Sequence, residues 1–167
     1  MATFRFGALD SRHRGRLAEI LAATAVFSRD EIDIALELFD ETSQGYEFLG
    51  LFASDGTLAG YACYGPTPAT CGTFDLYWIA VHPAAQGAGG GTRLLDEVER
   101  RLGERGGRLV IVETSSRAAY QPTRRFYDTR GYREAARVAD FYAAADDRVI
   151  YTKRLGRGDA AAAARSL

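Results

Sequence analysis

The sequence predicts an α/β fold, in which a mixed and mostly antiparallel sheet is flanked by helices. Helical and strand-like patterns alternate along the chain. Three strand-like runs separated by short breaks indicate an antiparallel meander. A strand, a glycine-rich turn, a helix and another strand follow, and this βαβ order requires two parallel strands. The 167 residues, 47% hydrophobic and 26% charged, suffice for one compact domain, which we expect over residues 1–155, followed by a flexible tail over 156–167.

The N-terminal third predicts a short strand and two helices. Phe4 to Phe6 alternates like a strand, and Asp10 or Ser11 is suited to cap a helix. The positions that recur at helical spacing in this first helix are Leu17, Ile20, Leu21 and Thr24.

A capping box marks the start of the second helix. Ser28 and Glu31 have the required spacing, and Phe27 and Ile32 stand where a hydrophobic staple closes over the helix start. The residues that we expect this helix to bury are Ile32, Ala35, Leu36 and Phe39.

The central segment predicts the meander. Residues 46–53 and 57–64 flank Ser54-Asp55-Gly56, a hairpin signal, and residues 73–81 form a third strand after the breaker Gly65-Pro66-Thr67-Pro68.

The C-terminal half predicts two more helices and three strands. After the glycine-rich turn a helix carries Leu94, Leu95, Val98 and Leu102 on one face, and a strand follows over 109–112. A shorter helix has Pro122 near its start and Gly131 just after its end. The last two strands, 132–141 and 149–154, are joined by 143–147.

Composition excludes several function classes. The formal net charge of −1 offers no broad basic face for nucleic acid. No stretch approaches the about 20 apolar residues of a membrane span, and residues 1–5 lack the apolar core of a signal peptide, so we expect a cytoplasmic protein. His13 and His82 have no ligand partners at metal-binding spacing, and we expect Cys63 and Cys71 to be buried thiols.

The turn after the third strand is a candidate anion site. Glycines allow close backbone approach, and the amides that open the next helix point at the same spot. The turn does not fit the nucleoside triphosphate loop, because Thr92 and Arg93 follow Gly91 where that loop needs lysine. It does not fit the dinucleotide fingerprint either, because the sixth position counted from Gly87 is Thr92. A turn of this kind is also common without any ligand.

Two motifs resemble the GNAT superfamily of N-acetyltransferases. The run from Val81 to Leu95, with Gln86-Gly87-Ala88-Gly89-Gly90-Gly91, is similar to the family's acetyl-coenzyme A motif. Residues 125–132, with Phe126-Tyr127 and Gly131-Tyr132, resemble its second signature. Together they cover residues 73–155, and the N-terminal third agrees in layout only. The resemblance implies helices on both faces of a sheet that splays between the strands at 79–81 and 109–112.

The resemblance also implies how acetyl-CoA, the co-substrate, binds without a metal. Main-chain groups of Ile79, Ala80 and Val81 would pair with the pantetheine arm. The pyrophosphate would lie on the amides of Gln86, Gly87, Ala88, Gly89, Gly90, Gly91 and Thr92. Arg124 is a further candidate for the cofactor, although a surface arginine needs no such role. Many members carry an asparagine seven residues before the signature tyrosine, and here that position is Tyr120.

For the chemistry, the resemblance implies Tyr127 as general acid toward the departing thiolate, with packing beside Phe126 as the alternative. Glu113 and Asp75 are candidate bases for the amine. Asp140, Phe141 and Tyr142, with Tyr77, are candidate acceptor-binding residues, and Asp146 and Asp147 are suited either to attract a cationic amine or to form a plain hairpin.

The expected partner is a small-molecule or peptide amine, with no nucleic acid and no membrane, bound by a monomer or a homodimer. The competing hypothesis is a non-catalytic module that binds or senses acyl-coenzyme A. Such a module has no need of the tyrosine at position 127, and that tyrosine is present.

Overall fold

The computed structural model describes residues 3–41 and 45–156. Its strands form one sheet in the order β1-β2-β3-β4-β5-β7-β6. The strands are β1 (Arg5–Ala8), β2 (Glu47–Phe52), β3 (Leu58–Pro66), β4 (Thr73–Val81), β5 (Leu109–Ser115), β6 (Arg133–Ala143) and β7 (Asp146–Arg154). The α-helices are α1 (Arg14–Ala23), α2 (Arg29–Asp40), α3 (Pro83–Gln86), α4 (Gly90–Glu104) and α5 (Gln121–Asp128), and the 3-10 helices are η1 (Ser11–His13) and η2 (Ala118–Tyr120). The last residues of the predicted tail, 157–167, lie outside the described part of the chain.

Contacts divide the chain into two compact units. The first comprises Met1–Gly65 with Tyr77–Val98, and the second comprises Pro66–Leu76 with Glu99–Leu167. The strand β4 therefore contributes its first part to the second unit and its later part to the first.

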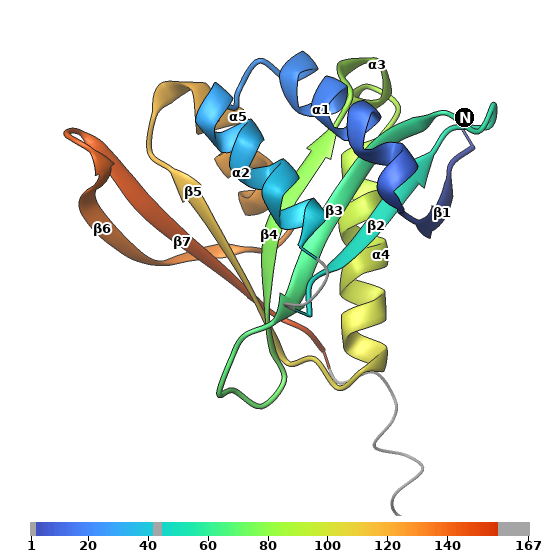
Figure 1. The fold of residues 1–167 in the computed structure, drawn as a ribbon. Helices are drawn as coiled ribbons and strands as arrows, with labels where there is room; N and C mark the ends of the chain where they lie inside the picture. Colours follow the sequence, from blue (N-terminus) through green and yellow to red (C-terminus); the bar gives the residue numbers. More distant parts are fainter. Residues whose placement is uncertain (1–2, 42–44, 157–167) are drawn as a thin grey trace, which may run out of the picture. The chain divides into compact units, whose positions relative to one another are not determined.

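In the first unit, α1 and α2 cover one face of the strands and α4 covers the other (Figure 1). The core between α1, α2 and the strands is made of fully or nearly fully buried side chains, namely Leu17, Ile20, Leu21, Ala35, Leu36, Leu58, Tyr61, Cys63 and Ala80. Burying a leucine or isoleucine of this kind stabilises the fold by about 1.5–3 kcal/mol. The predicted apolar faces of α1 and α2 are confirmed in part, because Ile32 and Phe39 are only partly buried against this core and Thr24 is not in it.

Local signals set the helix starts in this unit. The Ser28 side chain accepts a hydrogen bond from the Glu31 amide at 3.2 Å, and the Glu31 carboxylate accepts one from the Ser28 amide at 2.7 Å. This confirms the predicted capping box. Asp10 makes the corresponding cap on η1, which precedes α1.

The predicted hairpin between β2 and β3 is confirmed. Gly56 adopts a φ of +85°, and its amide donates to the carbonyl of Ala53 at 2.9 Å. The left-handed conformation suits glycine because it has no Cβ.

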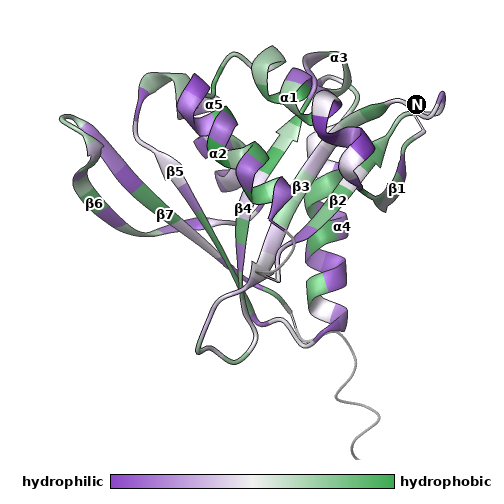
Figure 2. Ribbon diagram, in the orientation of Figure 1, coloured by the Kyte–Doolittle hydropathy of each residue, from purple (hydrophilic) through white to green (hydrophobic). Residues whose placement is uncertain are grey.

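The second unit is built on β5, β7 and β6. Strand β5 pairs in parallel with the first part of β4, from Thr73↔Leu109 to Leu76↔Val112, and pairs antiparallel with β7 along its whole length. The parallel pair confirms the predicted βαβ unit. Polar and apolar residues are interspersed along β6 and β7 without strict alternation (Figure 2).

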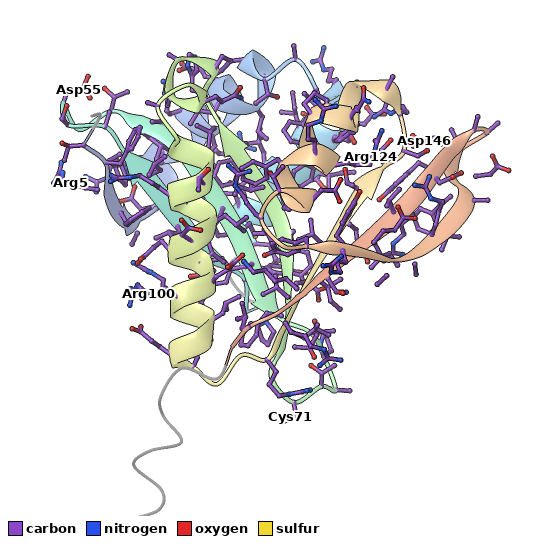
Figure 3. All side chains as sticks on the ribbon, turned by 180° about the vertical axis from the view of Figure 1, so that it is seen from behind. Arg5, Asp55, Cys71, Arg100, Arg124 and Asp146 are labelled. Carbon is purple, nitrogen blue, oxygen red and sulfur yellow. The ribbon has the colours of Figure 1, made fainter. Side chains whose placement is uncertain are left out.

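Several sequence-based boundaries were wrong. β5 extends three residues beyond 112, and β7 begins at Asp146, so the turn of the last hairpin is shorter than the predicted 143–147. The single-turn helix α3 was not predicted. Cys63 is buried as expected, whereas Cys71 is exposed, because it lies in the turn between β3 and β4 and not in a strand (Figure 3).

Candidate active site

The turn after β4 is built by side chains that bond back to the main chain. His82 caps α3, because its Nδ1 accepts a hydrogen bond from the Ala84 amide at 3.3 Å and Pro83 follows as the first helical residue. The Gln86 side chain donates to the carbonyl of Val81 at 2.9 Å. Proline at the first helical position was the signal from which α3 was predictable.

The amides of this turn divide into two groups. Those of Ala88 and Gly89 donate within the turn, to the carbonyls of Ala85 at 3.3 Å and Gln86 at 3.1 Å. The amide of Arg93 donates to the carbonyl of Gly89 at 3.1 Å, which makes Gly90 the first residue of α4. Amides in the first turn of a helix have no acceptor inside that helix and form the positive end of its dipole. The start of α4 at Gly90 and Gly91 is therefore the part of the turn best suited to an anion. Thr92 follows them in the first helical turn and is half-buried.

The glycines of the turn have different roles. A Cβ at Gly90 would lie 3.0 Å from the carbonyl oxygen of Ala85 and 3.1 Å from a methyl of Leu51, so this glycine is needed for packing. A Cβ at Gly87 or Gly89 would meet nothing within 4 Å, and Gly89 has a φ of +78°. The predicted binding of the pyrophosphate by the amides of all these glycines stays a prediction.

The strand that leads into the turn is largely buried. Ala80 and Val81 are buried and Ile79 is half-buried. These three residues belong to the first unit, with the turn. The predicted divergence of this strand end from β5 stays a prediction.

Tyr127 lies in the second unit, near the end of α5, where it is 3% exposed. Its ring packs against Tyr132 at 5.3 Å and Tyr151 at 6.1 Å between centroids, and against Phe126 at 5.4 Å. Burial raises the pKa of the Tyr127 phenol, because the charged form is poorly solvated there. The side chain is therefore a protonated hydrogen-bond donor at neutral pH.

The start of α5 is held by arginines. Nη1 of Arg124 donates to the carbonyls of Ser115 at 2.6 Å and Arg117 at 2.9 Å. The guanidinium of Arg117 lies 5.2 Å from the ring centroid of Tyr120, a buried residue that caps α5. At least one nitrogen of Arg124 is therefore used in hydrogen bonds that stabilise the fold.

The two candidate bases are engaged by neighbours. Asp75 is half-buried and accepts a hydrogen bond from the Thr67 hydroxyl at 2.7 Å. Glu113 forms an ion pair with Arg148. A carboxylate in an ion pair must give up that partner's attraction in order to accept a proton.

The candidate acceptor residues divide between the units. Tyr77 belongs to the first unit, is 37% exposed and lies edge-on to Tyr46 at 5.0 Å. Phe141 and Tyr142 lie on β6, where about half of each side chain is exposed and the two rings meet edge to face at 5.0 Å. The Arg148 guanidinium lies over Phe141 at 4.8 Å.

The aspartates near this aromatic pair are committed to the hairpin. Asp140 has a φ of +52°, its carboxylate accepts from the Ala145 amide at 2.6 Å, and its own amide donates to Asp147 at 3.1 Å. Asp147 also pairs with Arg137 at 3.2 Å, and these two contacts lower its pKa. Asp146 is buried. These contacts favour the hairpin alternative for the paired aspartates.

Over residues 3–41 and 45–156, no group of three or more His, Cys, Asp or Glu side chains is placed to hold a metal ion. No helix in these ranges is both long enough and apolar enough to cross a membrane.

The comparisons with known proteins identify the family. The model of the Acetyltransferase (GNAT) family matches residues 14–132, which include the glycine-rich turn and Tyr127. A comparison with curated proteins finds no match. Among solved structures, a Desulfovibrio desulfuricans protein assigned to the GNAT family as an acetyltransferase is 43% identical, with a TM-score of 0.85 over 93% of this chain and 100% of its own.

Two more distant structures share the fold. The ribosomal-protein-S18-alanine N-acetyltransferase of Escherichia coli is 20% identical, with a TM-score of 0.75 over 95% of this chain and 97% of its own. The Salmonella typhimurium protein yncA, solved with its cofactor acetyl-CoA, is 21% identical, with a TM-score of 0.69 over 96% and 97%. The family match and the 43% identical structure show that this chain belongs to the GNAT family and is an acetyl-coenzyme A-dependent N-acetyltransferase.

Proposed function

We propose that this chain moves an acetyl group from acetyl-CoA to a primary amine of a small molecule or peptide, by direct attack in a ternary complex. The observation that carries the proposal is the helix start at Gly90, where the amides that open α4 follow a turn matching the family motif. The relative yncA, which shares this fold, was solved with acetyl-CoA. In this chain the main chain at 79–81 would bind the pantetheine arm and residues 86–92 the pyrophosphate, with Arg124 as a further contact.

The reaction forms a C–N bond and breaks the C–S bond of the thioester. The amine nitrogen attacks the acetyl carbonyl, the nitrogen loses its proton, and coenzyme A leaves as a thiolate that takes up a proton. Tyr127 is the proposed donor to that thiolate. Its raised pKa keeps the proton on the phenol until it is needed. The phenol first stabilises the departing thiolate by a hydrogen bond, because the reference pKa of the thiol, about 8.5, lies below that of the phenol, about 10. Transfer of the proton forms the thiol and leaves a phenolate, which regains its proton from solvent as the products leave.

The amine must also be deprotonated before it attacks. A lysine-like ammonium has a pKa of about 10.4, so the neutral form costs on the order of 4 to 5 kcal/mol at pH 7 without help from the site. We propose that Glu113 or Asp75 accepts this proton, directly or through water. Phe141 and Tyr142 would supply apolar walls for the acceptor, and Asp140 would fix the hairpin that carries them. Tyr77 is a separate candidate for acceptor binding.

The first experiment is a panel of amines. The protein is incubated with acetyl-CoA and with peptides, polyamines, amino acids or aminoglycosides, and free coenzyme A thiol is measured. Turnover with one class identifies the acceptor. Tight acetyl-CoA binding without turnover on any class would contradict the proposed reaction and favour a binding module.

The second experiment isolates the phenol. Tyr127→Phe is expected to lower kcat by about a hundredfold or more, the usual contribution of a general acid, with little change in acetyl-CoA affinity. Tyr132→Phe is the matched control, because it removes a hydroxyl from the same aromatic cluster, one that donates to Glu99 at 2.9 Å. The control should lose some thermal stability and keep its kcat. Equal kcat for Tyr127→Phe and the wild type removes the phenol from the mechanism.

A further inference from the structure

Asp146 is a buried charge that the proposed reaction does not use. Within the described ranges it is the one charged side chain in the buried class, at 6% exposure. Its Oδ1 accepts a hydrogen bond from the Ser115 hydroxyl at 2.5 Å, and its Oδ2 lies 3.2 Å from Nε of Arg117. A buried carboxylate is stable only while such partners remain in place. Asp146, at the first residue of β7, therefore fixes the chain just after β5.

The same short segment also holds the start of α5. The Ser115 hydroxyl accepts from the Arg117 amide at 3.0 Å, which shapes the turn that leaves β5. Nη1 of Arg124, from the first half of α5, reaches back to the carbonyls of Ser115 and Arg117. Arg124 and Asp146 thus approach one small segment from different elements (Figure 3). The contacts form a continuous chain from β7 to α5.

Tyr127 follows Arg124 by three residues, a rise of about 4.5 Å along the helix. Its ring is held at the other end of α5 by Tyr132 and Tyr151. Rotation or sliding of α5 is resisted at one end by the aromatic cluster and at the other by the contacts of Arg124. Loss of the aromatic contacts or of the Arg124 hydrogen bonds would let the Tyr127 phenol change its orientation.

We propose that Asp146 is a positioning residue, which holds Ser115, Arg117 and through them Arg124, so that α5 presents the Tyr127 phenol in a fixed orientation. This inference rests on the proposed role of Tyr127. It gives Asp146 a function different from attraction of a cationic acceptor, because both of its oxygens are already engaged.

The test compares Asp146→Asn with Asp147→Asn. The neighbouring Asp147 bonds to Arg137 and to the Asp140 amide and has no side-chain contact with Ser115 or Arg117 among those described, so it controls for loss of charge in the hairpin. Asp146→Asn is expected to lower kcat at least about tenfold, because small misplacements of a reacting group cost one to two orders of magnitude. The KM for acetyl-CoA should change less than about twofold. Asp147→Asn keeps an Oδ1 that can accept from the Asp140 amide, so it should leave hydrogen exchange over 121–128 as in the wild type.

Two further measurements separate positioning from general damage. Amide hydrogen exchange over 121–128 should quicken in Asp146→Asn, while exchange in α1 stays unchanged. In a Tyr127→Phe background, Asp146→Asn should cause no further loss of kcat, because the group it positions is already gone. Ser115→Ala removes one partner of Asp146 without disturbing its charge and should show the same pattern more weakly.

The outcomes are distinguishable. If Asp146→Asn lowers kcat equally with and without the Tyr127 hydroxyl, or leaves exchange over 121–128 unchanged, positioning is wrong. If Tyr127→Phe alone has the wild-type kcat, the proposed acid fails and the catalytic role of Asp146 fails with it. In that case the hydrogen-exchange data still show whether the contacts of Asp146 restrain α5.

Discussion

Two glycines of the same turn should respond in opposite ways to an added methyl group. At Gly90, a Cβ would stand 3.0 Å from the carbonyl oxygen of Ala85, 3.1 Å from Cδ2 of Leu51 and 3.2 Å from Cγ1 of Val81. Carbon atoms at rest are about 3.5–4.0 Å apart. Leu51 and Val81 are buried and cannot turn away into solvent. Overpacking of this kind costs about 1–3 kcal/mol, and the better helix propensity of alanine offsets up to about 1 kcal/mol.

With the middle of that range, about 2 kcal/mol, the net loss for Gly90→Ala is about 1–2 kcal/mol, which corresponds to a Tm lower by about 2–8 °C for a protein of this size. Gly87 has a φ of −63° and a ψ of −16°, and a Cβ there would meet nothing within 4 Å. Alanine at such a position restricts the unfolded chain and stabilises by about 0.4–1 kcal/mol. Gly87→Ala should therefore keep or raise the Tm.

Acetyl-CoA binding is the second readout. The methyl of Gly87→Ala occupies space beside the proposed pyrophosphate site, so we expect the Kd for acetyl-CoA to rise at least about tenfold, or 1.4 kcal/mol. Thermal unfolding and calorimetric titration measure both quantities on the same samples. A Gly90→Ala variant as stable as the wild type would refute the packing argument. A Gly87→Ala variant with undiminished acetyl-CoA affinity would refute the proposed contact of the cofactor with residue 87.

Two other predictions concern local structure and buried thiols. Ser28→Ala should lower the free energy of unfolding by about 1 kcal/mol, since the Glu31 amide loses its capping partner, and kcat should stay unchanged; denaturant unfolding that shows no loss contradicts the capping role. A thiol reagent should titrate Cys71 alone in the native protein and both cysteines after unfolding, because Cys63 is fully buried. Burial raises the pKa of the Cys63 thiol from 9.0 to about 12, so the unfolded chain loses that proton first. The protonated Cys63 thiol therefore contributes its full stability below about pH 9. Above that pH the free energy of unfolding falls by up to about 1.4 kcal/mol per pH unit, and this slope should be smaller in Cys63→Ala.

Much of the fold could be predicted from the sequence, because the signals that specify it are local. A capping box joins residues three positions apart, and a hairpin turn needs only Asp55 and Gly56. The strand Thr73–Val81 was predicted with its observed bounds, because breakers stand on both sides of an apolar run. The glycine-rich turn and the phenylalanine-tyrosine pair were found in the same way, as short motifs at the expected separation.

Boundaries were wrong where a distant partner sets them. Glu113 to Ser115 continue β5 because they pair with the start of β7, more than thirty residues later in the chain. The sequence of this segment, with the polar residues Thr114 and Ser115, looks like the end of a strand until that partner is known. Likewise Cys71 stands near apolar strands in sequence, yet lies exposed in a turn.

Most of the helices and strands, the family motifs and the helix start that the cofactor is proposed to use were predictable from local patterns, because periodicity, caps and turns act over a few residues. The folded chain was needed to show that β7 lies between β5 and β6, that Gly90 is a packing residue, and that Asp146 is buried against Ser115. Each of these depends on groups brought together by folding from far along the chain. Burial and pairing of that kind depend on the whole sheet, and the local sequence pattern does not reveal them.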